Sequence, residues 1–539
     1  MKAIQLENIR SLKNTGSIPI QPITLLLGEN SSGKSTFLRI FPLLKQSIQK
    51  KTNGPILWAG DVDDYVDFGS FDETVTNDGS NSMRLTFSFE IPFDQFFSQM
   101  YLDTNRWFPK KNPFSINYSI LVEKRTDKEF VSELAVTINE TEIKLSRLQD
   151  KYPTVCVDGE DVCFSPLNDS DSDDTERYFF WRIYSGRSVF GIHMPNIARW
   201  VRHELKQFLD SDLKQDLIDE YHEFALLSIG DALFNGVAIQ DVKNAFFEEK
   251  NNKRKKSRGQ SSIYSRIEKT ILRIFENIEG LSDEESLYTT HLIELLYFYV
   301  NYNEIEEYIR AYYSQVHYIA PLRATAERYY RLRNSAIDEV DYQGKNLAIF
   351  LNSLPAQRMR QFQEWTVRHF GFKTIVTKNV GHLSVEITRS GNEKAINLSD
   401  TGFGYSQILP IITQLWELSS RERNSRKAKQ VVPLVIAIEQ PELHLHPAMQ
   451  ARLAESFIAC LDLAKENGYL LQLILETHSE TMINYFGRAI AREKLNPDEV
   501  AIVLFEKDEI SNKTYTSTSK YDNDGFLCNW PIGFFSPEE

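Results

Sequence analysis

The sequence contains few cysteines and no long apolar segment. Its four cysteines include no CxxC pair, which argues against a zinc ribbon or a disulfide framework and favours a reducing cytoplasm. The N-terminus, Met1–Arg10, lacks the basic and then apolar layout of a signal peptide. Apolar stretches such as Leu292–Val300 fall well short of the ~20 residues that a membrane helix needs, which excludes a transporter with a fused membrane domain.

The chain also lacks an excess of positive charge. Its formal net charge is −14, so the surface as a whole does not favour nucleic acid, although a local basic groove stays compatible with this value. Hydrophobic residues make up 42% and charged residues 25% of the chain, as in ordinary globular proteins. A length of 539 residues allows two to four domains at roughly 150 residues each.

A phosphate-binding loop is the strongest motif. Gly28-Glu29-Asn30-Ser31-Ser32-Gly33-Lys34-Ser35 matches GxxxxGK[ST] and follows an apolar run, Ile23–Leu27, typical of a buried strand. The glycines let the backbone wrap close to phosphate oxygens, and the amides that follow open a helix whose positive end faces the anion. Lys34 is expected to reach the β- and γ-phosphates, and Ser35 to offer its hydroxyl to Mg²⁺. The expected cofactors are ATP and Mg²⁺, and the expected ATP-binding residues of this motif are Gly28, Asn30, Ser31, Gly33, Lys34, Ser35 and Thr36.

A second motif supplies an acidic residue. Val431–Ile438 is an apolar run fit for a central strand, and Glu439 follows it directly, as in the Walker B arrangement. We predict that Glu439 binds the metal beside Ser35. Positions 34 and 439 are so far apart in the chain that a large domain is expected between the two halves of the nucleotide site.

A third motif is rich in glycine. Leu398–Pro410 carries two glycines before Ser406-Gln407, where a helix is expected to begin, and a helix N-terminus suits an anion. Its place shortly before the Walker B strand is that of an ABC signature sequence. Gly404, Ser406 and Gln407 are therefore predicted to bind nucleotide.

Histidines follow the Walker B strand. Another apolar run, Tyr469–Glu476, leads to His478, which we predict to be a switch histidine that touches the γ-phosphate. His444 and His446 form an HxH pair, for which a loop at the nucleotide interface is favoured over a zinc site, since no further ligands are obvious.

These patterns predict an α/β fold with a mixed sheet and an inserted helical domain. The expected segments are 1–165, with the P-loop and antiparallel strands such as Met83–Ile91; 166–315, where apolar residues recur at helical spacing; and 316–539, with the remaining motifs. The acidic run at 168–176 is interpreted as a solvated loop rather than a metal site. The basic run at 250–258 is interpreted as a solvated loop, with a phosphate-contacting loop as the alternative.

The four motifs, in this order and at this spacing, resemble the RecF/SMC/OLD branch of ABC-type ATPases. The resemblance rests on PITLLLGENSSGKST, GFGYSQILPI, IEQPELHLHP and LETHSE. VDFGSF at Val66–Phe71, YIAPLRATAERYY at Tyr318–Tyr330 and NWPIGFF at Asn529–Phe535 resemble bacterial defence ATPases, most nearly the PtuA ATPases of Septu antiphage systems, including retron-associated ones. The resemblance implies a homodimer or higher oligomer in which two heads hold ATP between them. Gly404, Ser406 and Gln407 of one subunit would then meet the nucleotide at Lys34 of the other.

The sequence departs from that pattern in two places. OLD proteins carry a nuclease domain after the ATPase, and the segment after His478 is too short for one, so the resemblance implies a separate effector. That partner would be a PtuB-like HNH nuclease, with a reverse transcriptase and its RNA-linked DNA in retron systems. The acid that usually follows Walker B as the catalytic base is Gln440 here, which orients water but does not accept its proton. Glu442 is the candidate substitute, and otherwise hydrolysis is expected to be slow.

Three functions are compatible with these residues. The first is a regulatory ATPase that controls a nuclease in an antiphage complex. The alternative is a stand-alone RecF-like DNA repair or recombination ATPase, which predicts tight ATP-dependent DNA binding by the isolated chain. A scaffold with a vestigial site predicts no ATP binding.

Overall fold

The computed structural model describes most of the chain outside its middle. The described residues are 1–61, 64–76, 79, 81–92, 113–125, 128–146, 154–162, 182–183, 192–193, scattered positions between 201 and 278, 281–331, 337, 339–389, 394–421, 432–508, 510–511 and 513–531. The charged runs at 168–176 and 250–258 and most of the expected helical insertion lie outside them, as do residues 532–535 of the NWPIGFF motif.

The chain forms two compact units. Unit 1 contains Met1–Lys2, Lys50–Ile56 and Asn81–Arg310; unit 2 contains Ala3–Gln49, Leu57–Ser80 and Ala311–Glu539. The segment boundaries expected after 165 and 315 remain a prediction, whereas these units divide the chain near 50, 81 and 310. The antiparallel strands and the P-loop are expected together in segment 1–165, but they belong to different units. The strands from β5 onward belong to unit 1, and the P-loop belongs to unit 2.

Unit 1 is built on an antiparallel meander. Consecutive strands pair in the order β5 to β10: β5 (Ser82–Ile91), β6 (Phe114–Arg125), β7 (Lys128–Ile138), β8 (Thr141–Ser146), β9 (Thr154–Val157) and β10 (Glu160–Val162). A short pair, β11 (Arg182–Ile183) and β12 (Ile192–His193), is separate from it. Side chains alternate between buried and accessible along β5, the pattern that Met83–Ile91 predicts.

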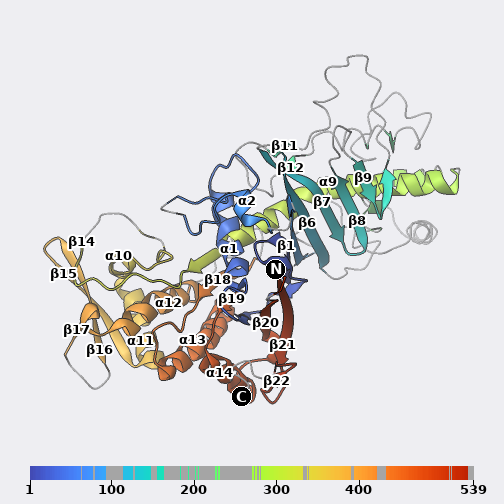
Figure 1. The fold of residues 1–539 in the computed structure, drawn as a ribbon. Helices are drawn as coiled ribbons and strands as arrows, with labels where there is room; N and C mark the ends of the chain where they lie inside the picture. The colour runs from blue at the N-terminus through green and yellow to red at the C-terminus, as the bar shows by residue number, and fades with distance from the viewer. Residues whose placement is uncertain are drawn as a thin grey trace, which may run out of the picture. The chain divides into compact units, whose positions relative to one another are not determined.

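The long helix α9 (Asp283–Ser314) lies along this meander (Figure 1). Aromatic side chains join the two. Phe89 stacks on Tyr308 with ring centroids 4.7 Å apart, and the hydroxyls of Tyr118 and Tyr302 lie 3.1 Å apart. No helix among the described residues is long and apolar enough to cross a membrane.

Unit 2 centres on a mixed sheet. Its strand order is β1-β2-β21-β20-β4-β19-β18-β13, with β3 on β1 and β22 on β21. The strands are β1 (Ala3–Ile9), β2 (Leu12–Asn14), β3 (Ile18–Pro19), β4 (Ile23–Gly28), β13 (Val316–Ile319), β18 (Leu434–Glu439), β19 (Leu471–Glu476), β20 (Val500–Lys507), β21 (Thr514–Tyr521) and β22 (Leu527–Cys528). The run β20-β4-β19-β18-β13 is parallel throughout, and β20 and β21 are antiparallel. The expected α/β fold with a mixed sheet is confirmed.

Helices cover both faces of the parallel strands. On one face, Leu25 and Ile436 belong to a core shared with α12 (Phe403–Ser419), α13 (Pro447–Glu466) and α14 (Glu480–Ile490), which lie together in Figure 1. On the other, α1 (Lys34–Gln49) packs against β13, β18 and β19, and its Phe37 contacts Phe505 of β20 with ring centroids 6.0 Å apart. Strands buried on both faces are continuous apolar runs, which is why β4, β18 and β19 are recognisable in the sequence.

A smaller sheet completes unit 2. It has the order β14-β16-β15, with β17 on β16. Its strands are β14 (Tyr330–Arg331), β15 (Phe372–Asn379), β16 (His382–Arg389) and β17 (Ile396–Asn397), and the helices beside them are α10 (Leu347–Ser353) and α11 (Ala356–Phe370). The short helix α2 (Phe71–Thr74) follows the VDFGSF segment.

Candidate functional site

The predicted motifs meet at one edge of the unit 2 sheet. Strands β4, β19 and β18 are parallel neighbours, so their carboxyl ends share an edge, where α/β proteins bind ligands. The P-loop follows β4 there, and Glu476 and Glu439 end β19 and β18 in register with one another. The strand that carries Glu476 therefore lies between the P-loop strand and the Walker B strand.

The phosphate loop has the backbone that its glycines predict. Gly28 adopts φ 144°, and a Cβ there would lie 2.2 Å from the Phe505 carbonyl oxygen, so the position admits only glycine. Ser31 is left-handed with φ 62°. The Lys34 ammonium spans the loop and donates to the carbonyls of Gly28 at 2.9 Å and Glu29 at 2.5 Å. Burial lowers the pKa of Lys34.

The remaining P-loop positions present polar groups around this turn. Asn30 and Ser31 are exposed, Thr36 is buried in the first turn of α1, and the Phe37 amide donates to the Gly33 carbonyl at 2.9 Å. Ser32 Oγ is buried and has no hydrogen-bond partner among the described residues.

The carboxylate that touches the P-loop serine is Glu476. Ser35 Oγ donates to Glu476 Oε1 at 2.8 Å. Burial raises the pKa of Glu476 to about 7, and the charge of Glu439 adds to the rise. The other oxygen, Oε2, is buried and without a hydrogen-bond partner in the described part of the chain.

Glu439, the predicted metal ligand, is held by other partners. Arg39 Nε donates to its Oε1 and Arg39 Nη2 to its Oε2, each at 2.7 Å. The Tyr318 hydroxyl also donates to Oε1 at 2.7 Å. This hydrogen bonding with Glu439 raises the pKa of Arg39, and burial raises that of Tyr318. Ser35 and Glu439 are thus close in the fold, but the serine is hydrogen-bonded to a different acid.

Four residues of this site were missed from the sequence: Arg39, Tyr318, Arg323 and Glu476. Two of them carry a recognisable signal. Arg39 follows Ser35 by four positions, which places both on one face of α1. Glu476 ends an apolar strand just as Glu439 does, immediately before the Thr477-His478 pair.

Arg323 supports the turn after the Walker B strand. Its Nη2 donates to the carbonyls of Glu439 at 3.0 Å and Gln440 at 3.3 Å, and Gln440 is left-handed with φ 42°. Its Nε and Nη1 are buried without partners among the described residues, and burial lowers the pKa of Arg323 to about 10.

Glu442, the candidate substitute base, anchors the histidine loop, which consists of Thr477 and His478. Its Oε1 accepts from the His478 amide at 2.7 Å and its Oε2 from Thr477 Oγ1 at 2.9 Å. Burial raises the pKa of Glu442. The His478 side chain is exposed at the same edge; partial desolvation and the nearby charge of Lys34 lower its pKa. Glu442 and His478 are therefore brought together, with Glu442 positioning the backbone.

The signature segment presents an exposed tip. Gly402 has φ 85° and Phe403 is 62% exposed, whereas Ser406 and Gln407 are buried in the first turn of α12. Ser406 Oγ donates to the Phe403 carbonyl at 2.8 Å, and Gln407 Nε2 to the Arg323 carbonyl at 3.5 Å.

The loop after the Walker B strand lies against this tip. The His444 ring is 6.1 Å from that of Phe403, and a Cβ on Gly404 would come no closer than 3.6 Å, to the His444 carbonyl. His446 Nδ1 accepts from the Ala448 amide and caps α13. The HxH pair therefore has local contacts of its own. Among the described residues, no cluster of three or more His, Cys, Asp or Glu could hold a metal.

Ser35 and Glu476 nevertheless fit a Mg²⁺ ion. Mg²⁺ usually binds through one or two carboxylates plus substrate phosphates and keeps several waters, so a larger acidic cluster is not needed. The unpartnered Oε2 of Glu476 beside the Ser35 hydroxyl has the oxygen chemistry that this ion prefers. When bound, the ion would neutralise phosphate charge.

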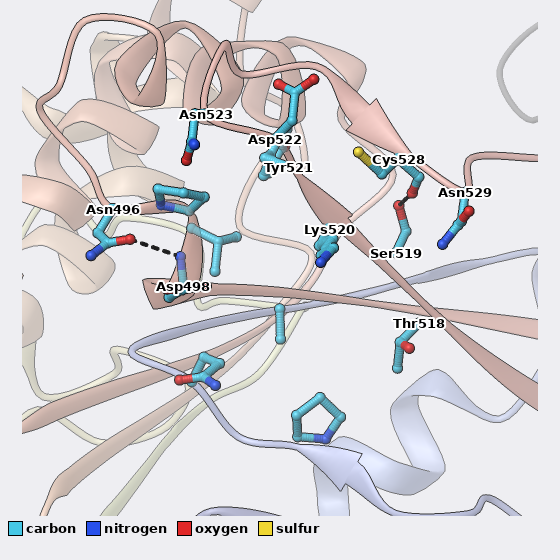
Figure 2. A pocket seen from close by; sticks show the side chains of 15 residues that line it. Asn496, Asp498, Thr518, Ser519, Lys520, Tyr521, Asp522, Asn523, Cys528 and Asn529 are labelled. Atoms are coloured by element: carbon cyan, nitrogen blue, oxygen red, sulfur yellow. Dashed lines mark hydrogen bonds between the residues drawn. The ribbon is translucent and has the colours of Figure 1, made fainter.

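A polar pocket of about 870 Å³ lies elsewhere in unit 2 (Figure 2). It is lined by residues of β20, β21 and the segment around Asn496, whose side chain accepts from the Asp498 amide at 3.0 Å. Val500 and Ala501 of its lining pair with the first residues of β4, so the pocket lies at the opposite end of the strands from the P-loop. Among the described residues, none that line it has a buried polar side-chain atom without a partner, whereas the P-loop edge has several.

Of the comparisons with known proteins, the family model identifies a class of protein. The family model described as "AAA ATPase domain" matches residues 1–483. A search of the curated proteins finds no match. Among solved structures, the chain is similar to the "SMC head domain from Thermotoga maritima" at 11% identity and a TM-score of 0.32, covering 96% of this chain and 97% of that one. At that TM-score the likeness supports no conclusion about this chain.

Proposed function

The chain belongs to the AAA ATPase domain family, and from this premise we propose that it is a regulatory ATPase whose heads pair around ATP and control a separate nuclease. ATP binds at Gly28–Ser35 with Mg²⁺. The observation that carries the proposal is the convergence of Lys34, Ser35, Glu476 and His478 at the carboxyl edge of β4 and β19. Such an edge binds phosphate and places polar groups around it.

Pairing of heads is supported by the signature tip. Phe403 is 62% exposed at a helix start flanked by Gly402 and Gly404, where it is accessible to a second head. The tip lies at the N-terminus of α12, where backbone amides suit a phosphate. Hydrogen bonds through Gln407 and Arg323 connect the tip to the Walker B turn of the same chain.

Slow hydrolysis is supported by the acids around Gln440. Gln440 cannot accept a proton, and both oxygens of Glu442 already accept hydrogen bonds from the histidine loop. A head that hydrolyses ATP slowly stays in its ATP-bound state for a long time. Such a long-lived state suits a clamp that controls a partner. The PtuA resemblance makes that partner an HNH nuclease, with a reverse transcriptase in retron systems.

The first experiment tests ATP-dependent pairing. The molar mass of the full chain is measured by light scattering after size exclusion, with and without ATPγS and Mg²⁺. Doubling of the 62.5 kDa mass with nucleotide is expected. Phe403→Ser should weaken pairing by at least ~10-fold, because it removes an apolar contact worth about 1.4 kcal/mol or more. Phe526→Ser, at a side chain 70% exposed in the same unit, is the matched control.

The second experiment identifies the effector. Tagged chain purified from its native operon should retain an HNH protein, and loss of phage protection should follow removal of either protein. Tight ATP-dependent DNA binding by the isolated chain, with no retained effector, would instead support a stand-alone repair ATPase.

A further inference from the structure

Two carboxylates compete for the metal at this site. Glu439 and Glu476 end adjacent parallel strands in register, and Glu476 accepts a hydrogen bond from the P-loop serine. Their hydrogen bonds differ, however, and that difference decides which of them is available to a cation.

Both carboxylate oxygens of Glu439 already accept hydrogen bonds. Arg39 donates to both of its carboxylate oxygens, and Tyr318 donates to one of them. Glu439 is 2% exposed, so these donors, rather than water, stabilise the negative charge of its carboxylate. Direct Mg²⁺ binding through Glu439 would compete with this bidentate ion pair.

Glu476 has the opposite arrangement. It is 4% exposed, its Oε1 accepts from Ser35 Oγ, and its Oε2 has no partner in the described part of the chain. A buried carboxylate oxygen without a partner is costly, and a bound cation would satisfy it. Because the Ser35 hydroxyl donates its hydrogen to Glu476 Oε1, the lone pairs of Ser35 Oγ remain available to a cation beside Glu476.

We propose that Glu476, rather than Glu439, is the carboxylate that binds the Mg²⁺ of Mg-ATP. Glu439 then has a structural role, because it is held in its ion pair with Arg39. This inference rests on the proposed ATP binding. Because Arg39 pairs with Glu439, the carboxylate that remains beside Ser35 is that of Glu476. One carboxylate, one hydroxyl and the nucleotide phosphates are a sufficient ligand set for Mg²⁺.

The test is the enhancement of nucleotide affinity by Mg²⁺. The Kd of fluorescent ATPγS is measured for the full chain in excess Mg²⁺ and in EDTA, and the ratio is taken within each variant. Glu476→Gln should lower the wild-type ratio by at least ~10-fold, the range that ligand-shell changes produce at metal sites. Glu439→Gln should change the ratio by less than about threefold, since the pair it breaks does not reach the metal.

Glu417→Gln is the matched control, because it removes an ion-paired glutamate bonded to Arg358 at 2.9 Å elsewhere in unit 2. A ratio that falls for Glu439→Gln, or that survives in Glu476→Gln, would overturn the inference. If wild-type protein binds no ATPγS in either buffer, the proposed function itself fails, which is a different result.

A spectroscopic readout covers the case in which Glu476→Gln does not fold. The electron paramagnetic resonance spectrum of Mn²⁺ bound with ATPγS is recorded for wild type, Glu476→Asp and Glu439→Asp. A changed spectrum with Glu476→Asp and an unchanged one with Glu439→Asp is expected. The reverse pattern, or identical spectra for all three proteins, would refute the assignment.

Discussion

Replacing Arg39 by Met isolates the contribution of its ion pair with Glu439. The variant keeps much of the aliphatic length but leaves a carboxylate that is 2% exposed with only the Tyr318 hydroxyl as a side-chain donor. Breaking a buried ion pair by removing one partner costs about 3–5 kcal/mol. Because Arg39 is 34% exposed and Tyr318 still donates, we expect a smaller loss of unfolding free energy, ~2–3 kcal/mol.

A double-mutant cycle measures the coupling between the two side chains. The free energy of unfolding is obtained from urea titrations of wild type, Arg39→Met, Glu439→Gln and the double variant. A coupling energy of ~1.5–3 kcal/mol is expected, at the upper end for residues in contact. The slope against urea should be the same in all four proteins, since the change concerns one pair rather than the extent of unfolding.

A coupling energy below ~0.5 kcal/mol would refute the reasoning, because pairs that do not interact add within about that limit. The cycle Arg358→Met with Glu417→Gln is the comparison. Its ion pair joins two partly accessible side chains at 26% and 14% exposure, so its coupling should be near ~0.5 kcal/mol.

Three further predictions concern the nucleotide site. Gly28→Ala should lower ATP affinity by at least ~10-fold and also lower Tm, because the added Cβ would lie 2.2 Å from the Phe505 carbonyl oxygen. Gly16→Ala is the control, since Gly16 has φ 59° and open space around it. It should cost only ~1–2 kcal/mol of stability and leave the ATP affinity measured by calorimetry unchanged. Gln440→Glu should raise the steady-state rate of phosphate release by at least ~10-fold, since it restores a proton acceptor next to the Walker B acid, and an unchanged rate would contradict a base at this position. Glu442→Gln should instead lower stability by ~1–3 kcal/mol, measured by urea titration, because both of its oxygens hold the Thr477-His478 turn; loss of activity at unchanged stability would point to catalysis by Glu442.

The sequence predicts the strands of this site well because they are buried on both faces. Ile23–Leu27 corresponds to β4, and the runs at 431–438 and 469–476 correspond to β18 and β19. Such strands are continuous apolar runs bounded by polar motifs, so their positions in the chain can be identified without knowledge of tertiary contacts. The glycine positions of the P-loop are equally local, since a positive φ is a property of the backbone itself.

The pairing of charges at the site could not be predicted in the same way. Which acid meets Ser35 depends on the strand order β4-β19-β18, and parallel strand order is a long-range property. The neighbour of the P-loop strand is β19, so Glu476 reaches the serine while Glu439 is left one strand away, where Arg39 meets it. The Walker B motif identifies only Glu439, so it does not reveal that Ser35 is hydrogen-bonded to Glu476 and Arg39 to Glu439.

Calorimetric titration of the full chain with Mg-ATPγS tests most directly that Gly28–Ser35 bind nucleotide. Wild type should bind with a Kd in the micromolar range, about −8 kcal/mol. Lys34→Ala removes the ammonium that spans the loop, so it should show no binding while keeping the wild-type Tm to within a few degrees. Binding of equal affinity by Lys34→Ala, or no binding by folded wild type, would contradict the assignment of an ATP site to this loop.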